Sequence, residues 1–319
     1  MQLPSSDAPW TEVRPFGKYF LDLLENRSWS VRRVTTIHPG VHQIGRRVSL
    51  DVDAEELTKR ARDAGLRMSS GASQVLPVPL GILAKGTLLD IDSVDQDDHV
   101  SSIAPSDRDS MVAMGIMAVA IERAGIPTNT RIRKVLHHIA SDETTATLSQ
   151  LIAVVSSSTR TISDEAAERG FNAADFDKWK TITDDSALIQ LLVQYARSFI
   201  AITRVAIPTS PDEQNTMTLK HRLIEPTRIP ERRPFWEAIG WRPMYLSVAT
   251  PSLGFSSSDH LRIEAPNGSS LVSAALARSV TKQPNQAFAV APSKQRYQRA
   301  LTTDRAVAHA RKVAPGDYS

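Results

Sequence analysis

Residues 187–208, ALIQLLVQYARSFIAITRVAIP, contain the change of pattern that decides the fold. The first part of this stretch is predicted to be a helix, with Asp184 or Asp185 placed before it as the N-cap. The last part is rich in β-branched and aromatic residues, which are enriched in strands. The sequence therefore predicts that a helix gives way to a strand near Ser198.

Strand-like patterns lie on both sides of a helical block. Short alternating runs occupy residues 1–105, helical patterns occupy 106–198, and alternating runs return over 199–319. Neither end alone offers enough alternating strands to close a sandwich, so both ends are expected to contribute to one body. The predicted fold is α+β, with a β-sandwich-like body from 1–105 and 199–319 and a helical insertion at 106–198.

Three runs predict particular strands. WSVRRVTT (29–36) and RVSLDV (47–52) alternate in polarity and are separated by a Pro-Gly turn, so they are predicted to form a strand pair. DRAVAHARKVAP (304–315) also alternates. It is predicted to be the final edge strand of a second sheet, with its basic side chains projecting outward.

The helical block opens with an unusually apolar helix. Ser106 and Asp109 form a capping signature, and MVAMGIMAVAIERAG (111–125) follows it. Because this run is apolar around nearly its whole circumference, it predicts a buried helix rather than a surface helix, and it is too short to cross a bilayer. The side chains expected to be inaccessible are Met111, Met114, Ile116, Met117 and Val119.

The composition is that of a globular chain and excludes several kinds of chemistry. Apolar residues make up 41% of the 319 residues, charged residues make up 23%, and the formal net charge is +3. The chain contains no cysteine, which excludes disulfides, cysteine-ligated metals and thiol catalysis. The N-terminal residues lack the pattern of a signal peptide, and no run approaches the roughly 18 apolar residues of a membrane span.

No catalytic signature stands out. The sequence lacks G-x-S-x-G, a P-loop and G-x-G-x-x-G, so it identifies no enzyme class and favours a non-enzymatic role, with no cofactor expected. His38 and His42 flank a Pro-Gly turn and cannot share a helix face, so a metal site is not expected there. The acidic run Asp90–Asp98 departs from the EF-hand pattern, and weak binding of a divalent ion is the alternative to a solvated loop.

Two arginine-rich segments form a candidate interaction surface. The first segment interleaves tryptophan with arginine, the residue types that dominate interface hot spots, and the second is the basic C-terminal tail. The residues of this surface are Arg228, Arg232, Arg233, Trp236, Trp241, Arg242, Arg299, Arg305, Arg311 and Lys312.

Five stretches resemble an uncharacterised group of actinobacterial proteins. They are WSVRRVTTIHPG (29–40), RRVSLDVD (46–53), VPLGILAKGTLLDIDSVDQDD (78–98), GWRPMYLSVATPSL (240–253) and SSDHLRIEAP (257–266). The resemblance implies a β-sandwich-like region interrupted by helices and followed by C-terminal membrane-spanning helices. It implies no activity.

The leading functional hypothesis is a non-enzymatic sensing or protein-interaction module, forming the cytoplasmic region of a membrane-associated bacterial protein. Its expected partner is a protein or the anionic inner face of the membrane. Two alternatives remain open: a nucleic-acid-associated protein that uses the basic tail, and a hydrolase or transferase whose site is assembled only in the fold.

Overall fold

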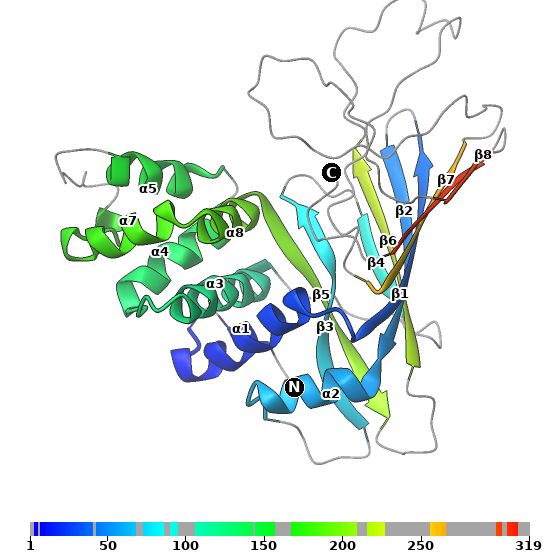
Figure 1. The fold of residues 1–319 in the computed structure, drawn as a ribbon, viewed down its shortest axis with the longest axis horizontal. Coiled ribbons are helices and arrows are strands. Elements are labelled where there is room, and N and C mark those ends of the chain that lie inside the picture. The colour runs from blue at the N-terminus through cyan, green and yellow to red at the C-terminus, as the bar shows by residue number, and fades with distance from the viewer. Residues whose placement is uncertain are drawn as a thin grey trace, which may run out of the picture. The chain divides into compact units, whose positions relative to one another are not determined.

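The structure is a computed structural model. It describes residues 3–5, 7–40, 43–67, 73–85, 90–94, 106–142, 144–156, 167–208, 216–226, 256–265, 298–301 and 305–311. These residues form helices and two sheets, which confirms the predicted α+β class (Figure 1). The chain divides into two compact units that are both discontinuous in sequence. The helical unit comprises Met1–Asn26, Glu55–Gly86 and Ser102–Glu213, and the sheet unit comprises Arg27–Ala54, Thr87–Ser101 and Gln214–Ser319.

The helical unit contains all the helices of the described residues and one antiparallel strand pair. The helices are α1 (Trp10–Glu25), α2 (Ala54–Asp63), α3 (Ser106–Arg123), α4 (Thr130–Ser141), α5 (Ala146–Ser156), α7 (Phe176–Asp184) and α8 (Ser186–Arg197), with the 3-10 turn η1 (Ala173–Asp175). The strands are β3 (Ser73–Ala84) and β5 (Ser198–Pro208). Helix α3 begins at Ser106, and strand β5 begins at Ser198.

The predicted change from helix to strand is confirmed. Asp185 is the N-cap of α8, and its Oδ1 accepts hydrogen bonds from the backbone N–H groups of Ala187 and Leu188 at 2.8 and 3.0 Å. Helix α8 ends at Arg197, and β5 begins at Ser198. The change occurs where β-branched residues replace good helix formers. Ile200, Ile202, Val205 and Ile207 are buried in the strand that pairs with β3.

Helix α3 is the buried helix that the sequence predicts. Met111, Met114, Ile116, Met117 and Val119 are all at most 6% exposed. Gly115 lies in the middle of this helix and contacts Gly17 of α1, where the two glycines let the backbones approach closely. Because neither glycine has a side chain, the backbones of α1 and α3 can pack closely at this point.

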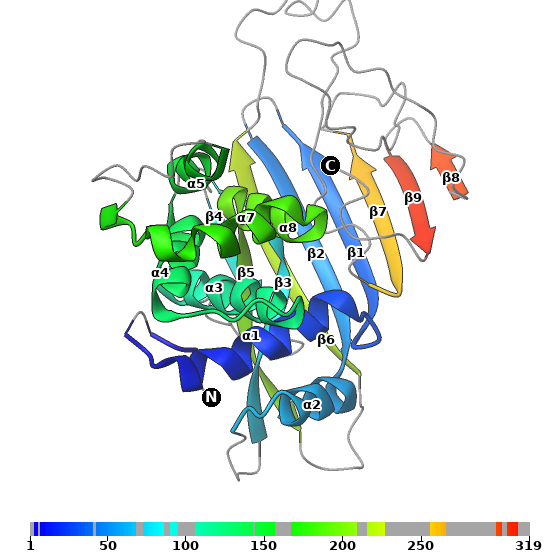
Figure 2. The same cartoon turned by 60° about the vertical axis from the view of Figure 1, so that its left-hand side comes forward.

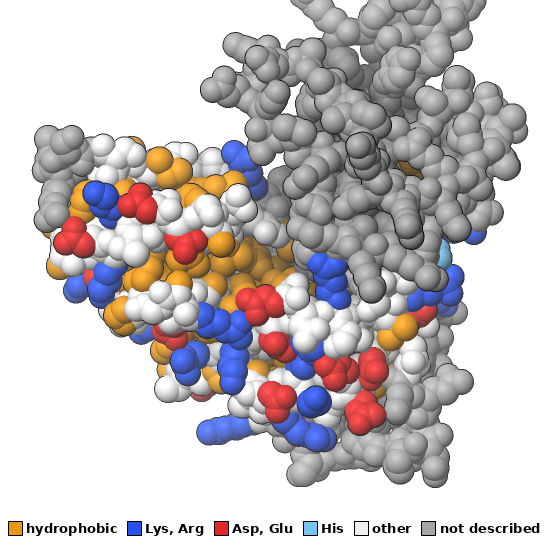
Figure 3. All heavy atoms as spheres, in the orientation of Figure 1, with side chains coloured by type: hydrophobic (Ala, Val, Ile, Leu, Met, Phe, Trp, Pro, Cys, Tyr) orange, Lys and Arg blue, Asp and Glu red, His pale blue; other side chains and the backbone are white. Residues whose placement is uncertain are grey.

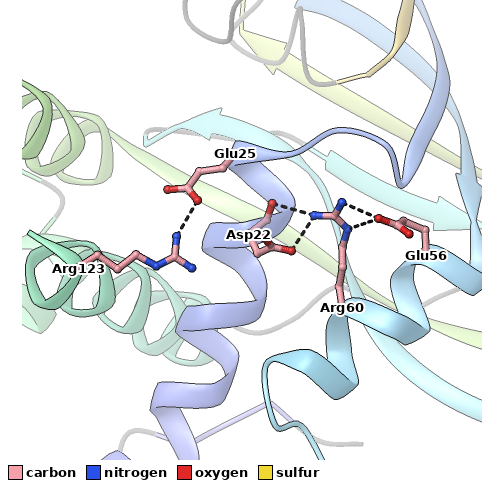
Figure 4. Close-up of polar contacts among 5 residues, drawn as sticks. All are labelled: Asp22, Glu25, Glu56, Arg60 and Arg123. Atoms are coloured by element: carbon pink, nitrogen blue, oxygen red, sulfur yellow. Dashed lines mark hydrogen bonds and ion pairs between the residues drawn. The ribbon is translucent and has the colours of Figure 1, made fainter.

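Ion pairs connect the helices around this core (Figure 4). Arg60 of α2 is 6% exposed, and its guanidinium lies 2.7 Å from Asp22 of α1 and 2.7 Å from Glu56 of its own helix. Arg123 at the end of α3 lies 2.6 Å from Glu25. Figure 3 shows basic and acidic side chains interspersed over the region of α1 and α2, as expected for an ordinary solvated surface.

The sheet unit is built on one mixed sheet of seven strands (Figure 2). In spatial order these are β4 (Asp90–Val94), β6 (Thr216–Pro226), β2 (Gln43–Asp53), β1 (Ser30–Pro39), β7 (Ser258–Glu264), β9 (Arg305–Arg311) and β8 (Gln298–Leu301). Neighbouring strands are antiparallel, except that β1 and β7 are parallel. For β4, β8 and β9 the structure describes the backbone alone.

The sheet confirms some strand predictions and corrects others. Of the two predicted strands, residues 30–36 and 47–52 do form the antiparallel pair β1–β2, and both ends of the chain contribute strands to the same sheet. A sandwich-like body is not confirmed, because these strands interleave in one sheet and the other described sheet is the β3–β5 pair. The predicted edge strand β9 is not at the edge, because residues 298–301 pair with its outer side as β8.

Candidate ligand-binding face

The central strands of the sheet have one buried face and one open face. Along β2, Ile44, Val48 and Leu50 are buried, while Gln43 and Arg47 are exposed and alternate with them. The register carries this alternation to β1, β6 and β7. The open face comprises Val34, Thr36, His38, Gln43, Gly45, Arg47, Ser49, Lys220, Arg222, Ile224, His260, Arg262 and Glu264.

The buried face contains charged side chains among its apolar ones. Arg46 lies beside Glu225, with Nε 3.2 Å from Oε1 and the second guanidinium nitrogen 3.3 Å from Oε2. Arg33 stands opposite Asp259 in the β1–β7 register, and these two side chains are 6% and 3% exposed. Burial lowers the pKa of Arg33 to about 10, and the negative charge of Asp259 opposes that shift. The guanidinium groups therefore remain charged and compensated within the sheet unit.

His221 of β6 is a neutral histidine on the buried face. It is 4% exposed, and its Nδ1 has no hydrogen-bond partner among the described residues. Burial, with a smaller contribution from the positive charge of Arg33, lowers the pKa of this imidazole from 6.5 to about 3. The ring is therefore uncharged in the folded protein near neutral pH.

The depressed pKa of His221 predicts a pH-dependent stability. In the unfolded chain the imidazole binds a proton below about pH 6.5, whereas the folded protein excludes that proton until about pH 3. Because the unfolded state binds more protons in this window, the free energy of unfolding falls as the pH is lowered through it. We expect His221→Leu to show a shallower fall than the parent in urea unfolding between pH 6.5 and about pH 4. Parallel curves for the two proteins would contradict this explanation.

Two arginines stand directly opposite each other at the centre of the open face. Arg47 of β2 and Arg222 of β6 are register partners, and both side chains are exposed. Neither guanidinium group forms an ion pair or a hydrogen bond with a described side chain. Like charges that face each other across two strands are destabilising. An anion that contacts both guanidinium groups would offset this repulsion, and the register places one acidic residue, Asp92 of β4, across from Arg222 on its other side.

Two hollows meet at this arginine pair. One hollow, of about 270 Å³, is lined by His38, Gly40, Gln43, Gly45, Arg46, Arg47, Arg222 and Ile224. The other hollow, of about 300 Å³, is lined by Val34, Thr36, Arg47, Val48, Ser49, Lys220, His221 and Arg222. Arg47 and Arg222 line both hollows, so the arginine pair lies where the two adjoin, and the two hollows together are called the groove.

The carboxylate of Glu264 lies at the side of the groove and has other partners. Its Oε2 is 3.4 Å from His38 Nδ1, and its Oε1 is 3.6 Å from a guanidinium nitrogen of Arg262. His38 Nε2 is buried and has no hydrogen-bond partner among the described residues. The Glu264 carboxylate therefore contacts His38 and Arg262. The Nε2 of His38 remains without a hydrogen-bond partner among the described residues.

Most residues of the surface predicted from the sequence lie outside the described residues. These are Arg228, Arg232, Arg233, Trp236, Trp241, Arg242 and Lys312. The backbone of Arg299 lies in β8, and those of Arg305 and Arg311 lie at the two ends of β9. Within the sheet, the register places Arg305 opposite Glu264 and Arg311 opposite Ser258.

The structure also places the candidate metal ligands. His38 ends β1 and contacts Glu264, while His42 lies outside the described residues. Asp90 and Asp92 belong to β4. Asp92 stands opposite Arg222 in the β4–β6 pair, and Arg47 stands opposite Arg222 in the β2–β6 pair. Within the described segments, no group of three or more histidine or acidic side chains is arranged to hold a metal ion.

Sequence patterns alone did not predict Arg47, Arg222 or the unpartnered Nε2 of His38 as site groups. The available signal was the alternation of RRVSLDV and TLKHRLIE, which places an arginine on the polar side of each strand. The pairing of these strands, which are 175 positions apart at Arg47 and Arg222, could not be read from either run.

Comparisons with family models, curated proteins and solved structures found no match to this chain. Of the helices in the described part of the chain, none combines the length and the apolar character needed to cross a membrane. The open face itself is therefore the feature from which a function can be inferred.

Proposed function

We propose that this chain is a non-enzymatic sensing or interaction module that binds an acidic segment of a protein partner along the open face of its sheet. The observation that carries the proposal is the arginine pair Arg47 and Arg222, opposed and without a partner among the described side chains. Bound carboxylates or other anions would neutralise this pair through charge-assisted hydrogen bonds. Neutralising the repulsion between the two arginines would contribute to the free energy of binding.

The shape of the groove favours an extended chain segment. The groove follows β2 from Gln43 to Ser49, a length of about 20 Å at the usual rise per strand residue. An extended peptide of about six residues has this length. Val34 and Ile224 add apolar contact area to the cationic centre, which suits a peptide that carries both acidic and apolar side chains.

Two other anionic partners fit these observations less well. A bilayer surface is broad and flat, whereas the arginine pair of this face lines recessed hollows. Nucleic acid is usually held by many phosphate contacts, whereas Arg262, another cation of this face, already contacts Glu264. Location in the cytoplasm at the inner face of a membrane, and membership of the resembling actinobacterial group, remain part of the proposal and rest on the sequence alone.

The test is a binding titration of the 319-residue chain with an acidic peptide probe. We expect a labelled peptide of about six residues, rich in glutamate and leucine, to bind more weakly as salt is raised. Arg47→Gln and Arg222→Gln should each weaken binding about tenfold or more, because a hydrogen bond to a charged group contributes about 1.5–3 kcal/mol.

The matched control is Arg62→Gln on α2, which removes an exposed arginine from the helical unit with the same change of net charge. It should leave the affinity for the peptide unchanged. An equal loss in all three variants would show a general charge effect and refute the proposed face. Tighter binding of single-stranded or duplex DNA than of the peptide would transfer the chain to the nucleic-acid class.

A further inference from the structure

We propose that the hollow at the end of the β1–β2 hairpin, lined by His38, Gln43, Gly45, Arg47 and Arg222, binds a phosphate monoester carried by the partner segment. This inference rests on the proposed function and assigns a chemical class to the group that occupies the middle of the groove. The proposed ligand is a phosphorylated side chain and not the carboxylate of a glutamate or an aspartate.

The charge of the arginine pair favours a dianion. One carboxylate carries a single negative charge, which is less than the combined charge of the two opposed guanidinium groups. A phosphate monoester carries about −1.5 to −2 at pH 7 and has three strong acceptor oxygens, so it can satisfy Arg47 and Arg222 together. Each guanidinium can donate two parallel hydrogen bonds to such a group. The Glu264 carboxylate at the side of the groove is already engaged by His38 and Arg262.

The hollow also has the space and the polar groups that a phosphate needs. Its volume of about 270 Å³ equals roughly nine waters at liquid density, enough for a phosphate group and the side chain that carries it. Gly45 contributes no side chain to this wall, and a Cβ there would lie 3.7 Å from His38 Cβ. His38 Nε2 is buried and has no hydrogen-bond partner among the described residues, and an imidazole nitrogen that carries hydrogen can donate to a phosphate oxygen.

The test compares phosphorylated and unphosphorylated forms of one peptide on the full chain. The probe is the glutamate- and leucine-rich peptide with a central phosphoserine, and its matched form has serine at that position. We expect the phosphopeptide to bind about tenfold or more tighter, since charge-assisted bonds to two arginines are added. Inorganic phosphate should displace it in competition.

Two variants locate the effect. Gly45→Val fills the hollow without changing the charge, so it should abolish the preference for the phosphopeptide while the serine peptide still binds. Arg47→Lys retains the charge but removes the planar fork, and it should also reduce the preference. Arg62→Gln is again the control and should preserve it. Retention of the full preference in both Gly45→Val and Arg47→Lys would refute this site.

The outcomes separate this inference from the proposed function. Equal binding of the two peptides overturns the phosphate site and leaves the acidic-segment proposal standing. Binding of neither peptide overturns both. Binding of vesicles that contain a phosphorylated inositol lipid, with no binding of the phosphopeptide, would assign the phosphate to a lipid headgroup and overturn the protein source.

Discussion

Replacing Ile116 with aspartate is expected to lower the free energy of unfolding by about 3–5 kcal/mol. Ile116 lies at the centre of α3, and its side chain is fully buried, with an exposed fraction of 0%. Aspartate at this position would place a carboxyl group in the buried interior of the helical unit. The variant therefore loses apolar burial and also has to desolvate a polar group.

The matched control for this prediction is Ile152→Asp on α5. Ile152 is 42% exposed, so its carboxylate would remain hydrated, and we expect a loss below about 1 kcal/mol. Both variants are measured by urea unfolding followed by circular dichroism. Similar midpoints for Ile116→Asp and the parent would show that α3 is not the core of the helical unit.

Replacing Gly17 with alanine is expected to cost about 2 kcal/mol or more, although alanine is the better helix former by about 1 kcal/mol. A Cβ on Gly17 would overlap the carbonyl group of Gly115 and lie 2.9 Å from its Cα. These are backbone atoms of α3 and cannot move aside by changing a rotamer. Helices α1 and α3 would have to separate, and their buried side chains would lose contact.

Gly115→Ala is the internal comparison for Gly17→Ala. A Cβ on Gly115 would lie 3.2 Å from Gly17 Cα and from a methyl group of Val13, which is tight without overlap. We therefore expect a smaller loss in this variant. If Gly17→Ala instead raises the midpoint, as an alanine does in an ordinary exposed helix, the close crossing of the two helices is wrong.

Local patterns predicted the parts of this fold that local forces determine. The change at Ser198 was predictable because Asp185 caps a helix and the residues after Arg197 are β-branched and aromatic. The burial of α3 was predictable because its apolar residues surround the whole helix. In each case the preference of a short segment agrees with its place in the structure.

Strand order and sheet number could not be read from the same patterns. The alternation of β9 predicted a strand, but it carried no information that β8 would pair with its outer side. The sandwich was expected because strands lie at both ends of the chain. The described strands of those ends instead interleave in one sheet, with β1 between β2 and β7.

The candidate site shows the same limit. Arg47 and Arg222 each lie on the polar side of an amphipathic strand, where a solvated arginine needs no explanation. Only the register of β2 with β6 makes them direct neighbours and reveals that two cations oppose each other. The residues that the sequence favoured, Trp236 and Trp241 with their arginines, lie outside the described residues and remain a prediction.

The central claim is that the Arg47–Arg222 pair costs stability and is compensated by a bound anion, and one comparison of unfolding free energies tests it most directly. The measurement is urea unfolding of the parent and of Arg47→Gln in a low-salt buffer, with and without inorganic phosphate, because the register partners of Arg47 are Thr36 and Arg222 whereas Arg222 also stands opposite Asp92. Without phosphate, we expect the variant to be more stable by about 0.2–1 kcal/mol, because a cross-strand repulsion is removed. Phosphate should then stabilise the parent by mass action and leave the variant unchanged. A variant that is less stable than the parent, combined with an equal response of both proteins to phosphate, would contradict the claim.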